Sequence, residues 1–437
     1  MPENALPIPG FVRLVLNRLK TAGYEAYIVG GAVRDSLLKR EITDWDMATS
    51  ASQEEIRAIF RDKRQFTLKH DTVTLVHSGL HFDVTTFRGE KRGLESDLSH
   101  RDFTINAMAL VLDRGLLIDP WDGLSDIRKR VIRAPGEPEA RFREDPLRLL
   151  RAVRLAAELK FRIHKKTFSA IKGTAFLIAS AAPERVRDEL MKILLLPEPS
   201  RAFNMTVRTG LLKFLLPELL EGHLKRQNRY HRYTIFRHIL ETVDRIRPDP
   251  VLRLAALLHD IAKPRTRVRR GGTWRFYGHE KKGALMAGEI LNRLRFSNQV
   301  KNRVVNLVRH HMIGYDSTWS DAAVRRLIRR VGTGEIQGLL ILRRADLLAH
   351  GLGGDPRLAA ELEMRVKKQI RLKMPIARKN LALNGRDVME ITGLSPGPEV
   401  GRILKVLNER VMDNPELNNR DMLTALLRDH SKRGRQL

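Results

Sequence analysis

The chain has 437 residues, of which 42% are hydrophobic, so it is expected to divide into about two to four domains rather than to fold around one core. It has no cysteine, which excludes disulfides, a thiolate nucleophile and a cysteine-ligated zinc site. Its formal charge of +29, from 80 Lys and Arg against 51 Asp and Glu, favours nucleic acid as a partner, with ribosome association or an anionic membrane surface as the alternative.

The N-terminal stretch MPENALPIPG lacks the basic-then-apolar order of a signal peptide. No apolar run approaches the ~20 residues that a membrane span needs. We therefore expect a cytoplasmic protein with no membrane partner.

The first part of the chain is predicted to mix strands and helices. EAYIVGG (25–31) is a short apolar strand that runs into two glycines, and AVRDSLL after it is typical of a helix start. VTLVHSG and LHFDVTTFR are expected to form two strands joined by a turn at Ser78 and Gly79. TINAMALVLD and GLLIDP are expected to form a second pair, which together predicts a mixed sheet with helices.

From about residue 140 the pattern becomes helical and remains so. DPLRLLRAVRLAAEL (145–159) places Leu and Ala on one face, and Pro stands at expected helix starts in AAPERV and PDPVLRLAALLHD. VKKQIRLKMPIARK (366–379) is a basic connector. No aromatic Phe, Trp or Tyr follows Trp319, so this end would hold nucleic acid through charge and shape rather than by stacking bases.

Three aspartates in the first part form a candidate metal site. Asp44 and Asp46 are two residues apart, so on a strand they face the same way and repel unless a cation lies between them. Asp83 lies in HFDVTTFR, a strand that can pair alongside. Three carboxylates on adjacent strands suit two magnesium ions, one activating an attacking hydroxyl and the other holding a nucleotide's phosphates. The alternative for TDWDMA is a solvated acidic loop.

Glycines and arginines around these aspartates are candidate phosphate ligands. Gly30 and Gly31 lie between a strand and a helix start, where a backbone can approach an anion, although a plain tight turn is the alternative. Arg101, beside Asp102, can clamp phosphate oxygens as a bidentate donor. Four residues fall at three-residue steps on one predicted helical face, for which a solvated salt-bridged face is the alternative: Asp145, Arg148, Arg151 and Arg154.

Five stretches in this order resemble the class II tRNA nucleotidyltransferase family, which comprises CCA-adding enzymes and bacterial poly(A) polymerases: YIVGGAVRDSLL, TDWDMATSA, HFDVTTFR, HRDFTINAMA and EDPLRLLRAVRLA. They span roughly residues 25 to 170. His100 departs from the family pattern, which usually carries a second Arg there. A neutral His would remove one phosphate contact.

The resemblance implies roles for the candidate residues. Asp44 and Asp46 would hold the magnesium ions, with Asp83 as a third catalytic carboxylate. The nucleotide would be bound by the remaining set, with Gly30, Gly31 and Arg34 on the triphosphate and with Arg101, Asp102, Arg151 and Arg154 lining the site.

Asp145 and Arg148 would read the incoming base without a nucleic-acid template. A carboxylate accepts a hydrogen bond from the exocyclic amine of cytosine or adenine, and an arginine donates to the neighbouring ring nitrogen. Uracil and guanine present a carbonyl instead, and an unpaired buried polar group costs about 1–3 kcal/mol.

The second half carries a further series of metal-ligating residue types on predicted helices: His238, His259, Asp260, His279, His310 and Asp346. Imidazoles and carboxylates on successive helices can converge inside a bundle and hold a divalent transition metal. The order H…HD…D resembles the HD phosphohydrolase superfamily, which implies metal-assisted hydrolysis of phosphoesters with Lys263 as a phosphate contact. A purely structural domain is the alternative.

The resemblances together imply an α+β protein in four parts: a nucleotidyltransferase head at 1–137, a helical neck with the base-reading motif at 138–205, an HD-type body at 206–362 and a helical tRNA-binding tail at 363–437. The implied partners are tRNA, CTP and ATP. Two rivals remain, a poly(A) polymerase and an RNA-binding scaffold in which only the HD domain is active.

The connection GEKRGLESDLS (89–99) is markedly shorter than in full CCA-adding relatives. In the family this loop helps the base-reading pair change from cytosine to adenine, and a short connection has little reach for such a change. The short form resembles CC-adding enzymes, which leave the terminal A to a separate A-adding enzyme. A trimmed loop without consequence is the alternative.

Overall fold

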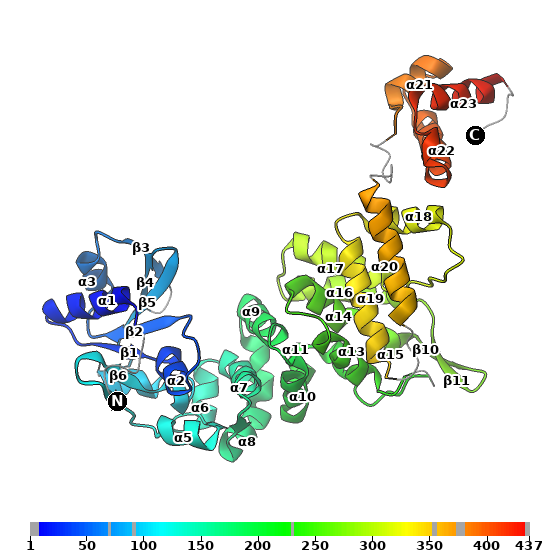
Figure 1. The fold of residues 1–437 in the computed structure, drawn as a ribbon. Coiled ribbons are helices and arrows are strands. Elements are labelled where there is room, and N and C mark those ends of the chain that lie inside the picture. Colours follow the sequence, from blue (N-terminus) through cyan, green and yellow to red (C-terminus); the bar gives the residue numbers. More distant parts are fainter. Residues whose placement is uncertain are drawn as a thin grey trace. The chain divides into compact units, whose positions relative to one another are not determined.

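The computed structural model describes residues 8–68, 71–89, 93–228, 231–351, 356–372 and 381–432. The chain divides into two compact units, Met1–Pro217 and Glu218–Leu437, and each is described by itself (Figure 1). The predicted class is confirmed, because the first unit begins with a mixed sheet and the rest of the described chain is mainly helical.

The head of the first unit is built on a seven-stranded sheet with strand order β3-β4-β5-β2-β1-β6-β7. β2 and β5 pair in parallel, whereas the other neighbouring strands pair antiparallel. The strands are β1 (Ala26–Val29), β2 (Trp45–Thr49), β3 (Arg64–Leu68), β4 (Thr72–His77), β5 (Leu80–Thr86), β6 (Ala109–Val111) and β7 (Leu116–Ile118).

Both predicted strand pairs are present. β4 and β5 form a hairpin whose turn residues, Ser78 and Gly79, both have the positive φ that a type I′ turn needs. β6 pairs with β7. The sequence analysis missed β3, because this edge strand has largely exposed side chains and no alternating apolar pattern.

The central strands form the buried floor of the head. Ile28, Val29, Met47 and Ala48 of β1 and β2 are at most 1% exposed. Three helices accompany these strands: α1 (Gly10–Thr21), α2 (Gly31–Leu37) and α3 (Gln53–Ile59). Because α2 packs against both β1 and β2, the short loop between β1 and α2 is held rigidly at the sheet.

The remaining helices of the first unit follow β5 in the chain. They are α4 (Leu94–Ser99), α5 (Gly123–Lys129), α6 (Pro138–Glu144), α7 (Leu147–Glu158), α8 (Lys165–Thr174), α9 (Pro183–Leu194), α10 (Pro199–Thr209) and α11 (Leu212–Leu215). The two-residue strands β8 (Val131–Ile132) and β9 (Arg162–Ile163) pair in parallel between them. The short helix α12 (Pro217–Leu220) spans the limit of the unit.

Asp145 does not share a helical face with the arginines that follow it, so this part of the prediction is wrong. Its backbone is extended, with φ −142° and ψ 99°, and it ends α6 before α7 begins. Pro146 follows, and proline disfavours the helical conformation of the residue before it.

The second unit is helical apart from one hairpin, β10 (Arg267–Arg270) with β11 (Thr273–Phe276). Its helices are α13 (Ile235–Asp244), α14 (Pro250–Leu258), α15 (Lys263–Thr266), α16 (His279–Arg293), α17 (Asn298–His310), α18 (Asp321–Val331), α19 (Ile336–Ala349), α20 (Pro356–Arg371), α21 (Gly385–Thr392), α22 (Pro398–Asp413) and α23 (Arg420–Lys432). α13, α14, α17 and α19 pack on one another and form the part that holds the second candidate site.

The last three helices have a hydrophobic core of their own, formed by Leu383, Val388, Val400, Ile403, Leu407, Val411, Leu423 and Leu427. The predicted boundary at 137 coincides with the start of α6, whereas those at 205 and 362 fall inside α10 and α20. The basic connector 366–379 lies partly in α20, and its residues 373–379 lie outside the described residues.

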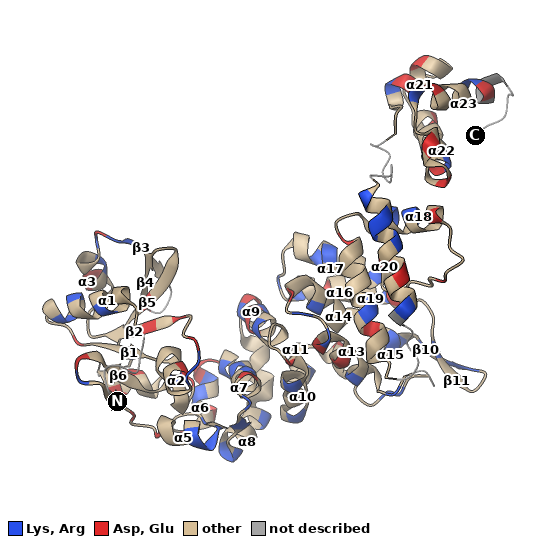
Figure 2. Ribbon diagram, viewed as in Figure 1, with Lys and Arg blue, Asp and Glu red and all other residues tan. Residues whose placement is uncertain are grey.

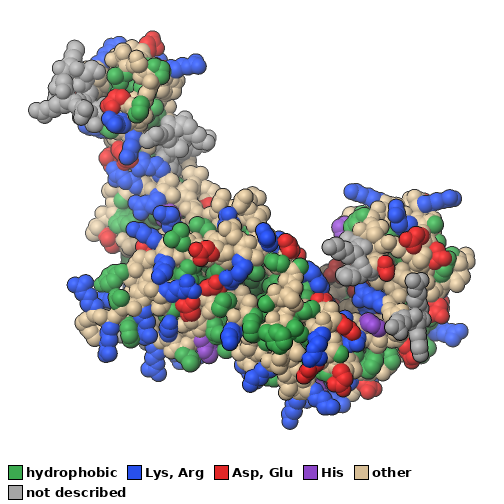
Figure 3. Space-filling model, turned by 180° about the vertical axis from the view of Figure 1, so that it is seen from behind, with side chains coloured by type: hydrophobic (Ala, Val, Ile, Leu, Met, Phe, Trp, Pro, Cys, Tyr) green, Lys and Arg blue, Asp and Glu red, His purple; other side chains and the backbone are tan. Residues whose placement is uncertain are grey.

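Basic side chains are spread over both units. Figure 2 shows Lys and Arg along many of the helices, and Figure 3 shows them scattered among apolar and acidic side chains on the opposite face. Within the described ranges, every helix is too short or too polar to span a lipid bilayer.

Candidate functional site

A cleft of about 950 Å³ opens beside the sheet of the first unit. Its lining is rich in charged groups and comes from the sheet, the loop before α2, the segment after α4, and the helices α6, α7 and α9. The lining residues are Gly30, Gly31, Asp46, Asp71, Phe87, Arg88, Gly89, His100, Arg101, Asp102, Asn106, Glu144, Asp145, Arg148, Arg151 and Arg185. Most of the residues predicted for nucleotide binding are thus brought together.

The turn between β1 and α2 lies against the side chains of Asp46 and Arg101. Val29, the last residue of β1, is in register with Asp46 of β2. Gly30 follows with φ +72°, and a Cβ there would lie 2.8 Å from Nη1 of Arg101 and 3.1 Å from Oδ2 of Asp46. Only glycine allows this backbone both the positive φ and the close approach of the two side chains.

The three predicted aspartates lie on or next to the paired strands β2 and β5. Asp46 and Asp83 are directly opposite each other on the two parallel strands, and Thr74 donates a hydrogen bond to Oδ1 of Asp83 (2.6 Å). Asp44 lies two residues before Asp46, exposed, just ahead of β2. Figure 2 shows this acidic stretch of β2.

Burial raises the pKa of Asp46. The neighbouring charges of Asp83 and Asp44 raise it further, and Arg101 acts in the opposite direction. Burial and two neighbouring carboxylates thus disfavour the ionised form of Asp46. A divalent cation bound to such a carboxylate removes the repulsion between the negative charges. The donor set therefore fits magnesium.

Several arginines line the cleft and are called its arginine wall. Arg151 of α7 donates twice to Oδ2 of Asp102, from Nε (2.9 Å) and Nη2 (2.6 Å). Burial opposes ionisation of Asp102, but Arg151 and Asn106 outweigh it and hold the pKa of Asp102 well below its usual range. Arg101 is similarly held by Asp97, at 3.1 Å and 2.9 Å.

Arg88 also lines this wall and was missed by the sequence analysis, although it closes the motif HFDVTTFR. Burial, followed by the nearby charge of Arg101, lowers its pKa. A bound anion would relieve the repulsion between these cations, so the wall fits phosphate groups.

Asp145 and Arg148 both line the cleft, but they have different partners. Arg148 donates to the carbonyl oxygen of His100 (2.6 Å) and to Glu144 (2.9 Å). Asp145 receives two hydrogen bonds from Arg185 of α9, from Nη1 (3.1 Å) and Nη2 (2.8 Å). Arg185 was missed because it lies 40 residues away in the sequence and APERVRDEL shows only a helix start.

Two residues predicted to bind the nucleotide are engaged with protein side chains. The buried Arg34 donates to both carboxylate oxygens of Asp35 (3.0 Å and 2.6 Å) and to Asn106 (2.7 Å). Arg154 donates to Glu189 (2.6 Å) and Glu158 (2.8 Å). Both guanidinium groups brace helices in this structure, and their contact with nucleotide stays a prediction.

The second candidate site lies among the helices of the second unit. His238 of α13, His259 and Asp260 after α14, and Asp346 of α19 are all at most 4% exposed. Nε2 of His238 is 3.0 Å from Oδ1 of Asp346 and 3.4 Å from Oδ2 of Asp260. Nε2 of His259 is 3.2 Å from Oδ2 of Asp260. The predicted convergence of these four residues is present in the structure.

The choice of His310 is wrong, and His311 occupies the predicted place. His311 is 1% exposed, and its Nε2 lies 3.2 Å from Nε2 of His279 and 3.7 Å from Oδ1 of Asp260. His310 is the last residue of α17 and is only half-buried. Consecutive helical residues point about 100° apart, so only one of two adjacent histidines can face the centre.

Backbone carbonyls orient the imidazoles. Nδ1 of His259, His279 and His311 donates to the carbonyl oxygens of Ala256 (2.8 Å), Phe276 (2.7 Å) and Val308 (2.7 Å), because a carbonyl can only accept. In the neutral ring Nε2 is then the nitrogen that carries the lone pair, and it lies 3.2 Å (His259), 3.4 Å (His279) or 3.7 Å (His311) from an oxygen of Asp260. This is the arrangement that metal-ligating histidines use.

In the described part of the chain, Nε2 of His238 and His259 and both carboxylate oxygens of Asp260 lack a hydrogen bond of good geometry. Burial disfavours the ionised form of Asp260, but the charges of His259 and Lys263 outweigh it and hold its pKa well below the usual range. Burial likewise lowers the pKa of His238, but its contacts with Asp260 and Asp346 raise it to about 9. The proton on His238 thus supplies the positive charge that the buried carboxylates require. A divalent metal would supply the same charge, so the residues fit such an ion.

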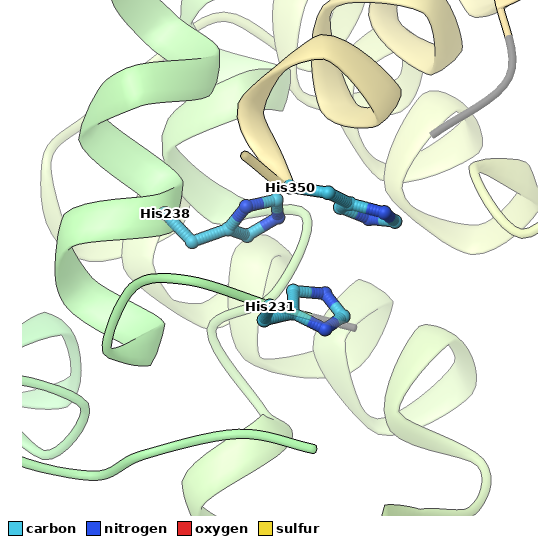
Figure 4. Close-up of side chains that lie close together, drawn as sticks. All are labelled: His231, His238 and His350. Carbon is cyan, nitrogen blue, oxygen red and sulfur yellow. The ribbon is translucent and has the colours of Figure 1, made fainter. Parts of the chain in front are cut away.

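Lys263 was predicted to contact phosphate, but its buried ammonium contacts Asp260 (2.6 Å) and Gln227 (2.9 Å). Two histidines that the sequence analysis did not select, His231 and His350, lie beside this centre (Figure 4). Their positions come from a loop and a helix end that are 119 residues apart, so no local motif indicates them.

Three family models match consecutive parts of the chain. They are the poly A polymerase head domain at 26–133, the probable RNA and SrmB-binding site of polymerase A at 160–222, and the HD domain at 233–351. These ranges follow the order of the cleft, the helices after it and the histidine-aspartate centre.

Two relatives are similar over most of their length. The CCA-adding enzyme of Levilactobacillus brevis is 32% identical over 435 residues, which cover 95% of this chain and 97% of that protein. The A-adding tRNA nucleotidyltransferase of Deinococcus radiodurans is 35% identical over 413 residues, covering 88% and 91%. The crystal structure of the Bacillus stearothermophilus CCA-adding enzyme in complex with CTP matches with a TM-score of 0.74 and 30% identity, over 96% of both chains.

Proposed function

The chain belongs to the CCA-adding enzyme family of tRNA nucleotidyltransferases, and on this premise we propose that its first unit transfers nucleotides from CTP or ATP to the 3′ end of tRNA in the cleft beside Asp46. The observation that carries the proposal is that Asp46, with the charges of Asp83 and Asp44 acting on it, lies in a cleft lined by arginines. Magnesium bound by these carboxylates would activate the attacking hydroxyl and neutralise phosphate charge. The arginine wall holds the triphosphate, and Gly30 lets the backbone approach it.

We assign base selection to Asp145 and Arg148, with Arg185 as the residue that positions Asp145. The two-point contact from Arg185 fixes the carboxylate plane, which decides where a base amine can donate. Arg148 is fixed separately by His100 and Glu144. The edge presented to the base is therefore held from two sides.

Replacing Arg185 by alanine should lower kcat/KM for CTP by about tenfold and raise misincorporation of UTP, because Asp145 loses its fixed orientation. Steady-state addition to tRNA with each of the four nucleotides measures this. Arg187→Ala is the control, since Arg187 lies on the same helix but contacts Asp188. Equal UTP discrimination in wild type and Arg185→Ala would remove the positioning role.

We propose that addition stops after two cytidines. In the described part of the short connection, α4 begins at Leu94 and the buried Asp97 is held by Arg101. A Cβ on Gly89 would lie 2.0 Å from Oγ of Ser96, so this residue is tightly enclosed. Residues 90–92 lie outside the described residues. A connection so short, with Gly89 and Asp97 held in its described part, leaves little freedom for a change from C to A recognition.

The expected result is that tRNA ending at the discriminator base gains two C residues and stalls when CTP and ATP are both present. Sequencing of the products measures this. Efficient addition of the terminal A would instead assign the complete CCA reaction. Addition of A only to tRNA that already ends in CC would assign the activity named for the Deinococcus radiodurans relative, and long A tracts would assign poly(A) synthesis.

For the second unit we propose metal-dependent hydrolysis of phosphoesters at the centre formed by His238, His259, Asp260 and Asp346. The buried Nε2 atoms and carboxylates converge without satisfying one another, which favours a cation between them. A divalent metal bound there would supply an activated water and polarise a phosphoester. Lys263 keeps Asp260 ionised and thus available as a ligand.

A further inference from the structure

We propose that the second unit binds an additional divalent transition-metal ion between His231 and His350, next to the centre formed by His238, His259, Asp260 and Asp346. This inference rests on the proposed metal binding at that centre. The subsite and the centre share Asp346 as a ligand. The ligand class follows from the donors, because two imidazoles and a carboxylate suit zinc, cobalt or nickel.

The donor atoms of this subsite converge from three segments. His231 precedes α13, His238 lies in α13, and His350 follows α19, and Figure 4 shows their rings close together. One ring nitrogen from each lies within 4.8 Å of the other two. The ring centroids of His231 and His350 are 4.2 Å apart. A single ion can therefore be reached by more than one of these side chains after small rotations.

His231 is oriented as a ligand. Its Nδ1 lies 2.8 Å from Oδ1 of Asn228, which can only accept, so Nδ1 carries the hydrogen and Nε2 keeps its lone pair. This Nε2 is buried and has no hydrogen-bond partner among the residues that the structure describes. Burying an imidazole nitrogen without a hydrogen-bond partner costs folding free energy unless a ligand binds to it.

The backbone holds the two histidines in place. His231 forms an isolated antiparallel bridge with Gly351, and the amide of Arg232 donates to the carbonyl oxygen of His350 (3.0 Å). Gly351 has φ +75°, and a Cβ there would lie 3.0 Å from Cβ of Arg232. The close pairing of these two segments therefore depends on glycine, and it fixes the spacing of the histidines before any ligand binds.

Asp346 links this subsite to the centre formed by His238, His259, Asp260 and Asp346. Its Oδ1 lies 3.0 Å from Nε2 of His238 and 3.3 Å from Nε2 of His350, and Arg343 donates to its Oδ2 (2.7 Å). Asp260 stands in the same relation to His279 and His311 on the other side, at 3.4 Å and 3.7 Å. Two buried carboxylates thus each lie between neighbouring groups of imidazoles, which is how carboxylates bridge adjacent metal ions.

Facing imidazoles favour a cation over an anion here. An anion would require protonated rings, and two imidazolium charges whose ring centroids are 4.2 Å apart would repel each other. A metal ion uses the neutral rings as they stand. The subsite is therefore assigned to a cation rather than to phosphate.

The test measures metal stoichiometry in the full-length protein. After removal of bound metal, wild type, His231→Gln, His350→Gln and the double variant are titrated with Co²⁺ by calorimetry and by the visible absorption of the ion. The double variant should bind one equivalent fewer than wild type, and each single variant should weaken one equivalent at least tenfold. His310→Gln, a histidine outside the cluster, should match wild type.

Equal stoichiometry and affinity in wild type and the double variant would overturn the inference and leave the main centre untouched. No Co²⁺ binding by any form would overturn the proposed metal centre itself. Should a variant misfold, by loss of its thermal transition without metal, anomalous diffraction from Co²⁺-loaded wild-type crystals decides the matter, with a peak expected between His231 and His350. Loss of inorganic phosphate binding, rather than of Co²⁺, in the double variant would also overturn it.

Discussion

Replacing Asp46 by alanine should abolish nucleotide addition, with a loss on the order of 10³-fold or more at saturating magnesium. The charges of Asp44 and Asp83 both act on Asp46, and the side chain of Asp46 lies against Gly30. No neighbouring carboxylate can therefore take over its position. Asp44→Ala should have a similar effect, because Asp44 lies just ahead of β2 and its charge acts on Asp46. Single-turnover extension of tRNA with CTP measures the loss.

Folding should survive this change, which separates a catalytic from a structural role. The pKa of Asp46 is raised in the folded protein, so its ionised form costs stability at neutral pH, and Asp46→Asn should leave the melting temperature without metal unchanged or higher. Asp62→Ala is the control, since Asp62 is a surface partner of Arg18 in the same unit. Only a few-fold loss of activity at saturating magnesium would refute the metal-ligand assignment.

The second large effect is expected at the histidine-aspartate centre. His259→Ala combined with Asp260→Ala should eliminate metal-dependent phosphohydrolase activity, by about 10³-fold or more, and leave nucleotide addition unchanged. Asp260 contacts four of the groups around it, namely His238, His259, Lys263 and His279, so its loss removes the common ligand. Hydrolysis of bis(p-nitrophenyl) phosphate with added divalent metals measures the activity.

Asp260→Asn provides a gentler second variant, because it keeps the volume of the side chain in this fully buried position. His310→Ala is the control, and its hydrolysis rate should match that of wild type because His310 lies outside the centre. A collapse of tRNA extension in a folded His259/Asp260 variant would show that the two sites are not independent. Undiminished hydrolysis would assign that activity elsewhere.

The candidate site could be predicted from the sequence wherever its chemistry is written in neighbouring residues. Gly30 follows an apolar strand, Asp44 and Asp46 alternate with the buried Trp45, and His259 adjoins Asp260. Each of these candidate sites depends on a local backbone conformation that the residue pattern already favours. The choice between His310 and His311 failed because the local pattern does not show which of two consecutive residues, pointing about 100° apart, faces the centre.

The sequence by itself determined the fold class, the hairpin at Ser78 and Gly79, the acidic pair on β2 and the HD pair after α14, because short-range periodicity and turn chemistry decide these features. Only the tertiary structure decided which charges meet across long separations. It placed Arg185 on Asp145, turned Arg34 toward Asn106, and brought His231 beside His350. The physical reason is that an ion pair or a metal site depends on distances of a few ångströms between side chains, and packing of whole helices sets those distances.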